Sequence, residues 1–173
     1  YDEHRTAAGQ ALLPGTGYLE LARAALAELH ESPSLQIQDL YFLSPLAVEN
    51  DGARDVTVTL TRDERGYGFE VSSRSARDKR AAPQVHAQAR LVADEHRVPA
   101  RIDHLSLAKR CPNVRHAAAG ASLHTRQEEH LRFGPRWRVI RSMALGQGEG
   151  LARLALPLAY RHDIADGHLV HPA

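Results

Sequence analysis

The apolar positions of this chain first follow a helical period. Over residues 16–31 they recur at intervals of three and four, which places one set of side chains on a single helix face: Leu19, Ala22, Leu26 and Leu29. Thr16 is a suitable N-cap, and Ser32-Pro33-Ser34 is suited to ending the helix. The pattern therefore predicts one long amphipathic helix near the start of the chain.

The sequence that follows has the period of two that is typical of strands. Apolar or β-branched residues alternate with polar ones in four stretches, at 36–46, 56–60, 67–71 and 85–91. The Asp63-Glu64-Arg65-Gly66 segment has the composition of a tight turn between two of them. We expect an antiparallel meander with one polar face. A long helix wrapped by such a curved sheet is the hotdog arrangement, which we predict for residues 1–95 in an α+β fold.

The second half has a weaker pattern. Residues 96–121 are rich in Ala, Arg and His and have little periodicity, so we interpret them as a linker. Two further strands are predicted at 139–145 and 151–156, joined by a glycine-rich turn. Because no closing helix follows, residues 122–173 are expected to be the start of a second, incomplete hotdog.

Composition narrows the classes of function. The chain of 173 residues has 25% charged residues, 43% hydrophobic residues and a formal net charge of +1, which gives no basic field for nucleic acid. Its eleven histidines and single cysteine show no metal-ligand spacing, so no metal is expected. No apolar run approaches the ~20 residues that span a bilayer, and the start is unlike a signal peptide. We expect a soluble, cytoplasmic protein without a membrane partner.

Three motifs carry a family resemblance. His4, Gly9 and Pro14 stand in the order of the His-x3-Gly-x4-Pro signature, and the helix head after Leu13 matches as well. Phe133-Gly134-Pro135-Arg136-Trp137 resembles a Tyr-Gly-Pro-x-Phe element. His171-Pro172-Ala173 is similar to the residues before a catalytic aspartate. Together these motifs resemble the dehydratase domains of modular polyketide synthases, whose fold is a double hotdog.

The chain departs from the family pattern in two places. His4 and Gly9 are five positions apart instead of four, so either Ala8 or Gly9 takes the place of the family glycine. The extra residue lies in the segment 5–8 and is able to re-aim the histidine. The family aspartate is expected just beyond Ala173, and Asp163 and Asp166 do not occupy its motif position.

The resemblance implies removal of water from a 3-hydroxyacyl thioester held on an acyl carrier protein. His4 would be the catalytic base, since a neutral imidazole accepts a proton near neutral pH. The amide of Gly9 or Ala8 would donate to the thioester oxygen. The other residues expected to contact substrate are Pro14, Tyr18, Phe133, Pro135 and Trp137. No cofactor is expected beyond the carrier's phosphopantetheine arm, and the expected partners are the carrier protein, other synthase domains and a possible second copy.

Several alternatives remain open at this point. Helical periodicity favours packing for Tyr18, and a turn packed on the sheet also explains the Phe133–Trp137 element. His130 and His171 are interpreted as structural. The same site is also compatible with a dehydratase/cyclase that closes a cyclic ether by oxa-Michael addition, or with a non-catalytic scaffold. A stand-alone hotdog thioesterase is disfavoured, because a single hotdog would lack the motifs of the second half.

Overall fold

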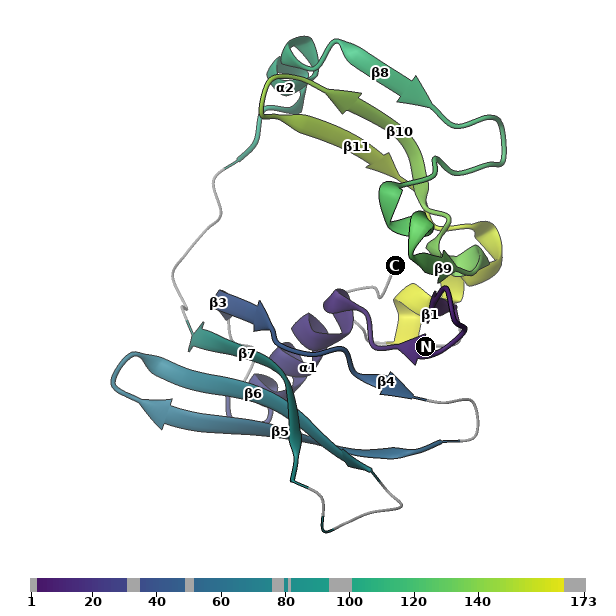
Figure 1. Cartoon of the computed structure of the whole chain (residues 1–173). Helices are drawn as coiled ribbons and strands as arrows, with labels where there is room; N and C mark the ends of the chain where they lie inside the picture. The colour runs from purple at the N-terminus through teal and green to yellow at the C-terminus, as the bar shows by residue number, and fades with distance from the viewer. Residues whose placement is uncertain are drawn as a thin grey trace.

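The described residues form three antiparallel sheets and one long helix (Figure 1). In this computed structural model the described residues are 3–30, 35–48, 52–75, 80, 82–93 and 101–166. No helix of that part is long and apolar enough to cross a membrane. The combination of one helix with extended antiparallel sheets agrees with the predicted α+β class.

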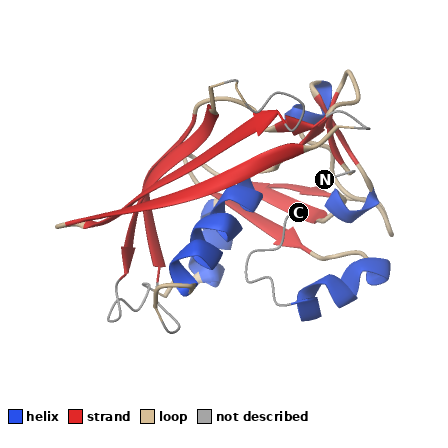
Figure 2. Ribbon diagram, turned by 90° about the horizontal axis from the view of Figure 1, so that it is seen from below, coloured by secondary structure: helices blue, strands red, loops and turns tan. Residues whose placement is uncertain are grey.

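Helix α1, Gly15–Ala27, lies against one face of the largest sheet (Figure 2). The strands of this sheet run in the order β3-β7-β6-β5 and comprise Leu35–Phe42, Gln84–Ala93, Gly66–Ser75 and Arg54–Asp63. All neighbouring strands pair antiparallel. The helix and sheet confirm the hotdog prediction for the first half, and the strands lie where the alternating pattern placed them.

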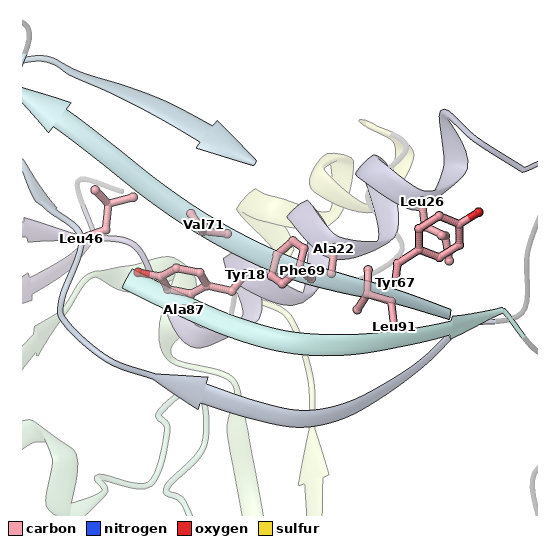
Figure 3. Close-up of a cluster of buried hydrophobic side chains, with 9 residues drawn as sticks. All are labelled: Tyr18, Ala22, Leu26, Leu46, Tyr67, Phe69, Val71, Ala87 and Leu91. Atoms are coloured by element: carbon pink, nitrogen blue, oxygen red, sulfur yellow. The ribbon is translucent and has the colours of Figure 1, made fainter. Parts of the chain in front are cut away.

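The buried core lies between helix α1 and the sheet. It is made of the apolar side chains Tyr18, Ala22, Leu26, Leu46, Tyr67, Phe69, Val71, Ala87 and Leu91 (Figure 3). The helix contributes residues at i, i+4 and i+8, so its buried face is centred on Ala22 and rotated away from Leu19. Leu29 is 55% exposed because the helix ends at Ala27, and its assignment to the buried face was wrong.

The helix also begins differently from the prediction. Its N-cap is Pro14, which has extended backbone, so Thr16 lies inside the first turn and is not the cap. Proline is well suited to the start of a helix because the first N–H groups have no intrahelical acceptor. This places Pro14, Gly15 and Thr16 at the positive end of the helix dipole.

Two backbone features shape the large sheet. The turn between β5 and β6 ends at Gly66, which has φ +130°, and a Cβ there would collide with the carbonyl oxygen of Leu91. Only glycine meets both demands. In β3, Asp39 has φ +49° at a break in register with β7 between Gln38 and Tyr41. Such a bulge redirects a strand, and here it precedes the segment that leads to Phe42.

A second, smaller sheet joins the two halves of the chain. Its order is β4-β2-β1-β9, formed by Ala47–Val48, Ala11–Leu12, His4–Thr6 and Leu131–Phe133. Strand β1 pairs with β9 in the register His4↔Phe133 and Thr6↔Leu131. The N-terminal strand is therefore hydrogen-bonded to a segment far away in the sequence, across the predicted division between the two hotdogs.

The third sheet belongs to the second half and has the order β11-β10-β8. Its strands are Gly150–Leu154, Ile140–Leu145 and Asn113–His116. Helix α2, His104–Arg110, precedes β8 and is capped by the Asp103 side chain. Both elements lie within the 96–121 stretch that was predicted as a linker, and β8 pairs with β10. Weak periodicity hid these elements: α2 is only seven residues long and no residue in it is buried.

The remaining elements of the second half are 3-10 helices. They are η1, η2 and η3, with bounds Arg126–Glu129, Pro135–Trp137 and Leu158–Asp166. Within the described ranges of the second half no helix of the length of α1 accompanies the β11-β10-β8 sheet. This agrees with the predicted incomplete second hotdog.

Candidate active site

His4 lies in strand β1 with one ring nitrogen fixed by the backbone. Its Nδ1 is 3.1 Å from the carbonyl oxygen of Leu12, in the neighbouring strand β2. A carbonyl only accepts hydrogen bonds, so Nδ1 carries the proton and donates it. Nε2 is then the unprotonated nitrogen in the neutral ring. The backbone thus selects the tautomer that leaves Nε2 as a base.

Two aromatic rings pack against the imidazole. The His4 ring centroid lies 5.4 Å from that of Phe133 and 5.0 Å from that of Trp137, and the two aromatic rings stack on each other. This half-buried setting lowers the pKa of His4, because desolvation penalises the imidazolium more than the bond to the Leu12 oxygen stabilises it. The ring therefore stays neutral to a lower pH than a solvated histidine.

We expect this lowered pKa to be measurable in stability as well as in activity. Below the ordinary histidine pKa of about 6.5 the unfolded chain binds a proton at His4 that the folded chain does not, so this residue costs stability as the pH falls. The difference in unfolding free energy between His4→Phe and the natural protein should favour the variant more at pH 5 than at pH 8. Urea denaturation at both pH values measures it, and a pH-independent difference would contradict the assignment.

The described residues around His4 enclose a cavity of about 740 Å³. Both halves of the chain line it. The first half supplies the start of α1 and the segment after β3, and the second half supplies the 120–128 region and β9 through β10. Apolar rings form much of the wall around His4: Tyr18, Phe42, Phe133 and Trp137. The wall next to His4 is therefore mainly apolar, whereas the 120–140 side also contributes charged groups such as His124, Glu128 and Arg138.

Four of the residues expected to contact substrate line this cavity together with His4. They are Pro14, Tyr18, Phe133 and Trp137. Tyr18 also belongs to the core, where it is 3% exposed and meets Phe42 edge-on, so it both packs and faces the chamber. Pro135 is not among the lining residues. It opens the turn η2, which presents Trp137.

The structure gives Gly9 a role in a turn. Its N–H donates to the carbonyl oxygen of Thr6 at 2.9 Å, and its φ of +91° is the left-handed conformation that glycine adopts readily. Gly9 is not among the cavity-lining residues. The expected donation from this amide to a thioester oxygen is therefore not supported by the geometry, because the N–H already has another acceptor.

The extra residue after His4 is accommodated in the same turn. Thr6 and Gln10 close it with a backbone bond of 2.9 Å, and Arg5 donates to the Gly9 carbonyl oxygen at 2.7 Å. The turn ends before β2, so Leu12 still lies beside His4. The longer spacing therefore changes the turn and leaves the imidazole in contact with the cavity.

Sequence reasoning missed the contribution of residues 120–128. The side chain of Glu128 accepts from the Thr125 N–H at 2.8 Å and from the His124 ring at 2.6 Å, which holds the turn η1 at the cavity wall. Thr125-x-x-Glu128 has the pattern of a capping box, so a signal for this turn was present in the sequence. His130 is not among the cavity-lining residues. Its carbonyl oxygen accepts a hydrogen bond from the Ala7 N–H.

Among the described residues, no three His, Cys, Asp or Glu side chains are grouped as metal ligands. His171-Pro172-Ala173, the third motif, lies outside the described residues. Asp163, which does not occupy the motif position, forms an ion pair with Arg136 at 2.6 Å.

Comparison with known proteins supports the resemblance over most of the chain. A family model described as polyketide synthase dehydratase domain matches residues 1–74, and one described as polyketide synthase dehydratase N-terminal domain matches residues 102–173. The polyketide synthase ThaG of Burkholderia thailandensis is 31% identical over 176 residues, which cover 95% of this chain and 3% of ThaG. PksM of Bacillus subtilis, also a polyketide synthase, is 23% identical over 90% of this chain and 4% of its own length.

Solved structures agree. A trans-AT polyketide synthase dehydratase domain from Brevibacillus brevis is 25% identical, with a TM-score of 0.80 over 98% of this chain and 60% of that one. An inactive mutant of the CurJ dehydratase, with a histidine replaced by phenylalanine, has a TM-score of 0.83 at 24% identity over 98% of this chain and 57% of that one. The fold and the cavity define a hotdog protein with a histidine as its candidate base. The chain belongs to the polyketide synthase dehydratase family. It spans 57–60% of these solved domains and a few per cent of the synthases it matches.

Proposed function

We propose that this chain contributes to a dehydratase that removes water from a 3-hydroxyacyl thioester held on an acyl carrier protein. One observation carries the proposal: His4 has its tautomer fixed by the Leu12 oxygen, and its ring packs against Phe133 and Trp137 in the wall of the cavity. Such a ring is neutral near neutral pH and has Nε2 as its basic nitrogen, which is what proton abstraction beside a carbonyl requires.

In the proposed reaction, His4 Nε2 takes a proton from the carbon next to the thioester carbonyl. The electron pair of that C–H bond becomes the new carbon–carbon double bond as the carbon–oxygen bond to the 3-hydroxyl breaks. The departing hydroxyl takes a proton and leaves as water. In the family this proton comes from an aspartate after the His-Pro motif, which here begins at His171. No electrons are gained or lost overall, so the reaction needs no redox cofactor.

The start of helix α1 is the best-placed group to stabilise charge on the thioester oxygen. Gly15 begins the helix, and both Gly15 and Thr16 line the same cavity as His4. The positive end of the helix dipole favours the negative charge that develops during proton abstraction. This replaces the Gly9 amide in the proposed mechanism.

The proposal extends to the partners of the reaction. The substrate would arrive on the phosphopantetheine arm of an acyl carrier protein, and the chain would work beside other domains of a polyketide synthase, as its relatives are parts of such synthases. A cavity of about 740 Å³ is within the range that holds small-molecule ligands. A second copy of the chain as partner remains part of the proposal.

The test is a mass measurement on a 3-hydroxyacyl pantetheine thioester. It is done with this chain and, in parallel, with the longest natural polypeptide that contains it. Loss of the mass of one water supports the dehydratase. A product of unchanged mass but altered retention, formed from a substrate with a distal hydroxyl, points to the dehydratase/cyclase alternative. Binding of the acyl carrier protein without any product in either polypeptide identifies a scaffold and overturns the proposal.

A further inference from the structure

Three charged side chains from distant parts of the sequence meet next to His4. Arg136, in η2, donates from Nε to Asp163 at 2.6 Å and lies 3.3 Å from a carboxylate oxygen of Glu3. Its own backbone N–H donates to the other Glu3 oxygen at 2.6 Å. The Arg136 guanidinium also lies over the ring of Tyr160, 4.6 Å from its centroid. We call Glu3, Arg136 and Asp163 the clamp.

The clamp is partly shielded from water. The side chains of Arg136, Glu3 and Asp163 are 33%, 24% and 15% exposed. Ion pairs in such positions are screened less than pairs on an open surface, and an arginine that bonds two carboxylates has little rotational freedom left. The clamp therefore fixes the relative positions of the start of β1, the turn η2 and the 3-10 segment η3.

Glu3 is tied to the same turn by its backbone as well. Its carbonyl oxygen accepts from the Gly134 N–H at 2.8 Å. A Cβ on Gly134 would lie 2.6 Å from the Glu3 Cβ, so only glycine allows this approach. Both the main chain and the carboxylate of Glu3 are therefore held by residues 134–136.

The segment that holds Glu3 is also the segment that flanks the base. His4 follows Glu3 directly, and its ring packs against Phe133 and Trp137, the two residues that border the Gly134–Arg136 stretch. Any rotation of the backbone at Glu3 would move the imidazole relative to these rings and to the Leu12 oxygen. The position of His4 Nε2 thus depends on the clamp, although no clamp residue is among those lining the cavity.

We propose that Glu3 and Arg136, with Asp163 holding the guanidinium, are positioning residues that set the orientation of His4. The inference rests on the proposed function only in so far as His4 is the base; the orientation itself is measurable without turnover. The clamp binds no substrate, so it should act on the chemical step and leave substrate affinity nearly unchanged.

The first test measures the environment of the His4 ring directly, by NMR. In protein with 15N-labelled histidine, the Nδ1–H that donates to Leu12 should give a protected, shifted signal, assigned by its loss in His4→Phe. In Arg136→Ala we expect this signal to broaden or move toward that of a solvated imidazole. Arg132→Ala is the matched control, since Arg132 is exposed on strand β9 and its loss removes the same charge from the same region.

The second test measures the steady-state kinetics of turnover. Misplacing a reacting group by about 1 Å costs up to about 100-fold in rate. We therefore expect Arg136→Ala to lower kcat by about 10- to 100-fold with KM changed by less than about threefold, which is the signature of an effect confined to the transition state. Arg136→Lys, which cannot bond both carboxylates through a planar fork, should restore only part of the rate.

Glu3→Gln keeps the size of the side chain and an oxygen for the Arg136 N–H, so it serves if Arg136→Ala does not fold. Because both residues act through one contact, Glu3→Gln combined with Arg136→Ala should lose no more than the more damaged single variant. An unchanged His4 signal in Arg136→Ala or Glu3→Gln, or additive losses, overturns the clamp. A changed signal in a protein that dehydrates nothing leaves the clamp standing and removes the proposed function instead.

Discussion

Replacing His4 by asparagine is expected to reduce water loss from a 3-hydroxyacyl thioester by about 100- to 10,000-fold, the usual contribution of a general base. Asparagine retains an N–H that can reach the Leu12 oxygen, which accepts from His4 at 3.1 Å, but it has no basic nitrogen. The variant therefore removes the chemistry while keeping the hydrogen bond that orders the strand. Initial rates of enoyl product formation, followed by mass spectrometry, measure the effect.

Two controls separate the loss of the base from a loss of fold. His4→Phe keeps an aromatic ring packed against Phe133 and Trp137 and should be as inactive as the asparagine variant. His116→Ala removes an exposed histidine from strand β8 and should retain the natural rate. Retention of more than about a tenth of the rate in His4→Asn would exclude His4 as the general base, since a base contributes at least about 100-fold.

Replacing His86 by leucine is expected to cost about 2–4 kcal/mol of unfolding free energy. His86 is fully buried in strand β7. Its Nδ1 lies 3.2 Å from the Ser44 carbonyl oxygen, which only accepts, so Nδ1 carries the proton and Nε2 accepts from Ser73 Oγ at 2.7 Å. Leucine fills a similar volume but leaves the buried Ser73 hydroxyl and the half-buried Ser44 carbonyl oxygen without this partner. Urea denaturation measures the loss.

The partner serine makes the prediction sharper. Ser73→Ala alone should cost about 1–2 kcal/mol by leaving Nε2 without a donor, and the double variant with His86→Leu should cost less than the sum of the two. Gln88→Ala, at an exposed position of the same strand, is the control and should change stability by less than about 0.5 kcal/mol. Additive losses would show that His86 and Ser73 do not act as a pair.

The hydrogen bonds of His86 also help to position one wall of the cavity. The Ser44 Oγ donates to the Val85 carbonyl oxygen at 2.6 Å, and Ser44 lines the cavity between Leu43 and Pro45. His86 thus braces the stretch of chain after β3 that forms one wall of the site. The sequence pattern placed His86 on the polar side of an alternating strand, because a period of two does not distinguish a solvated side chain from a buried one that is hydrogen-bonded.

Local periodicity predicted the elements of the first half because their burial is decided by neighbours along the chain. The strands around Val58 and Phe69 alternate, and the helix around Ala22 repeats every three to four residues. The exact helix face was less predictable. Tyr18 packs against Phe42 and takes the place expected for Leu19, and that contact depends on where the bulge at Asp39 directs β3.

The candidate site could be predicted only in part from the sequence, for a related reason. The motif residues His4, Phe133 and Trp137 were identified from the family resemblance, and the structure brings their rings together. The pairing of Glu3 with Arg136 was not predicted, because no pattern in a single sequence indicates which of many charged residues will meet across 133 positions. Helix α2 and strand β8 were missed because they are short and exposed.

The pairing of β1 with β9 has a consequence for how the site forms. Strand β1 pairs with β2 on one side and with β9 on the other, so during synthesis the imidazole lacks its second strand neighbour and both aromatic contacts until the chain has grown past Trp137. The large sheet and α1 are built from residues 15–93, and contacts of such short separation form first. The base is therefore set in the last stage of folding, and a nascent chain that stops earlier holds a packed first hotdog without a working site.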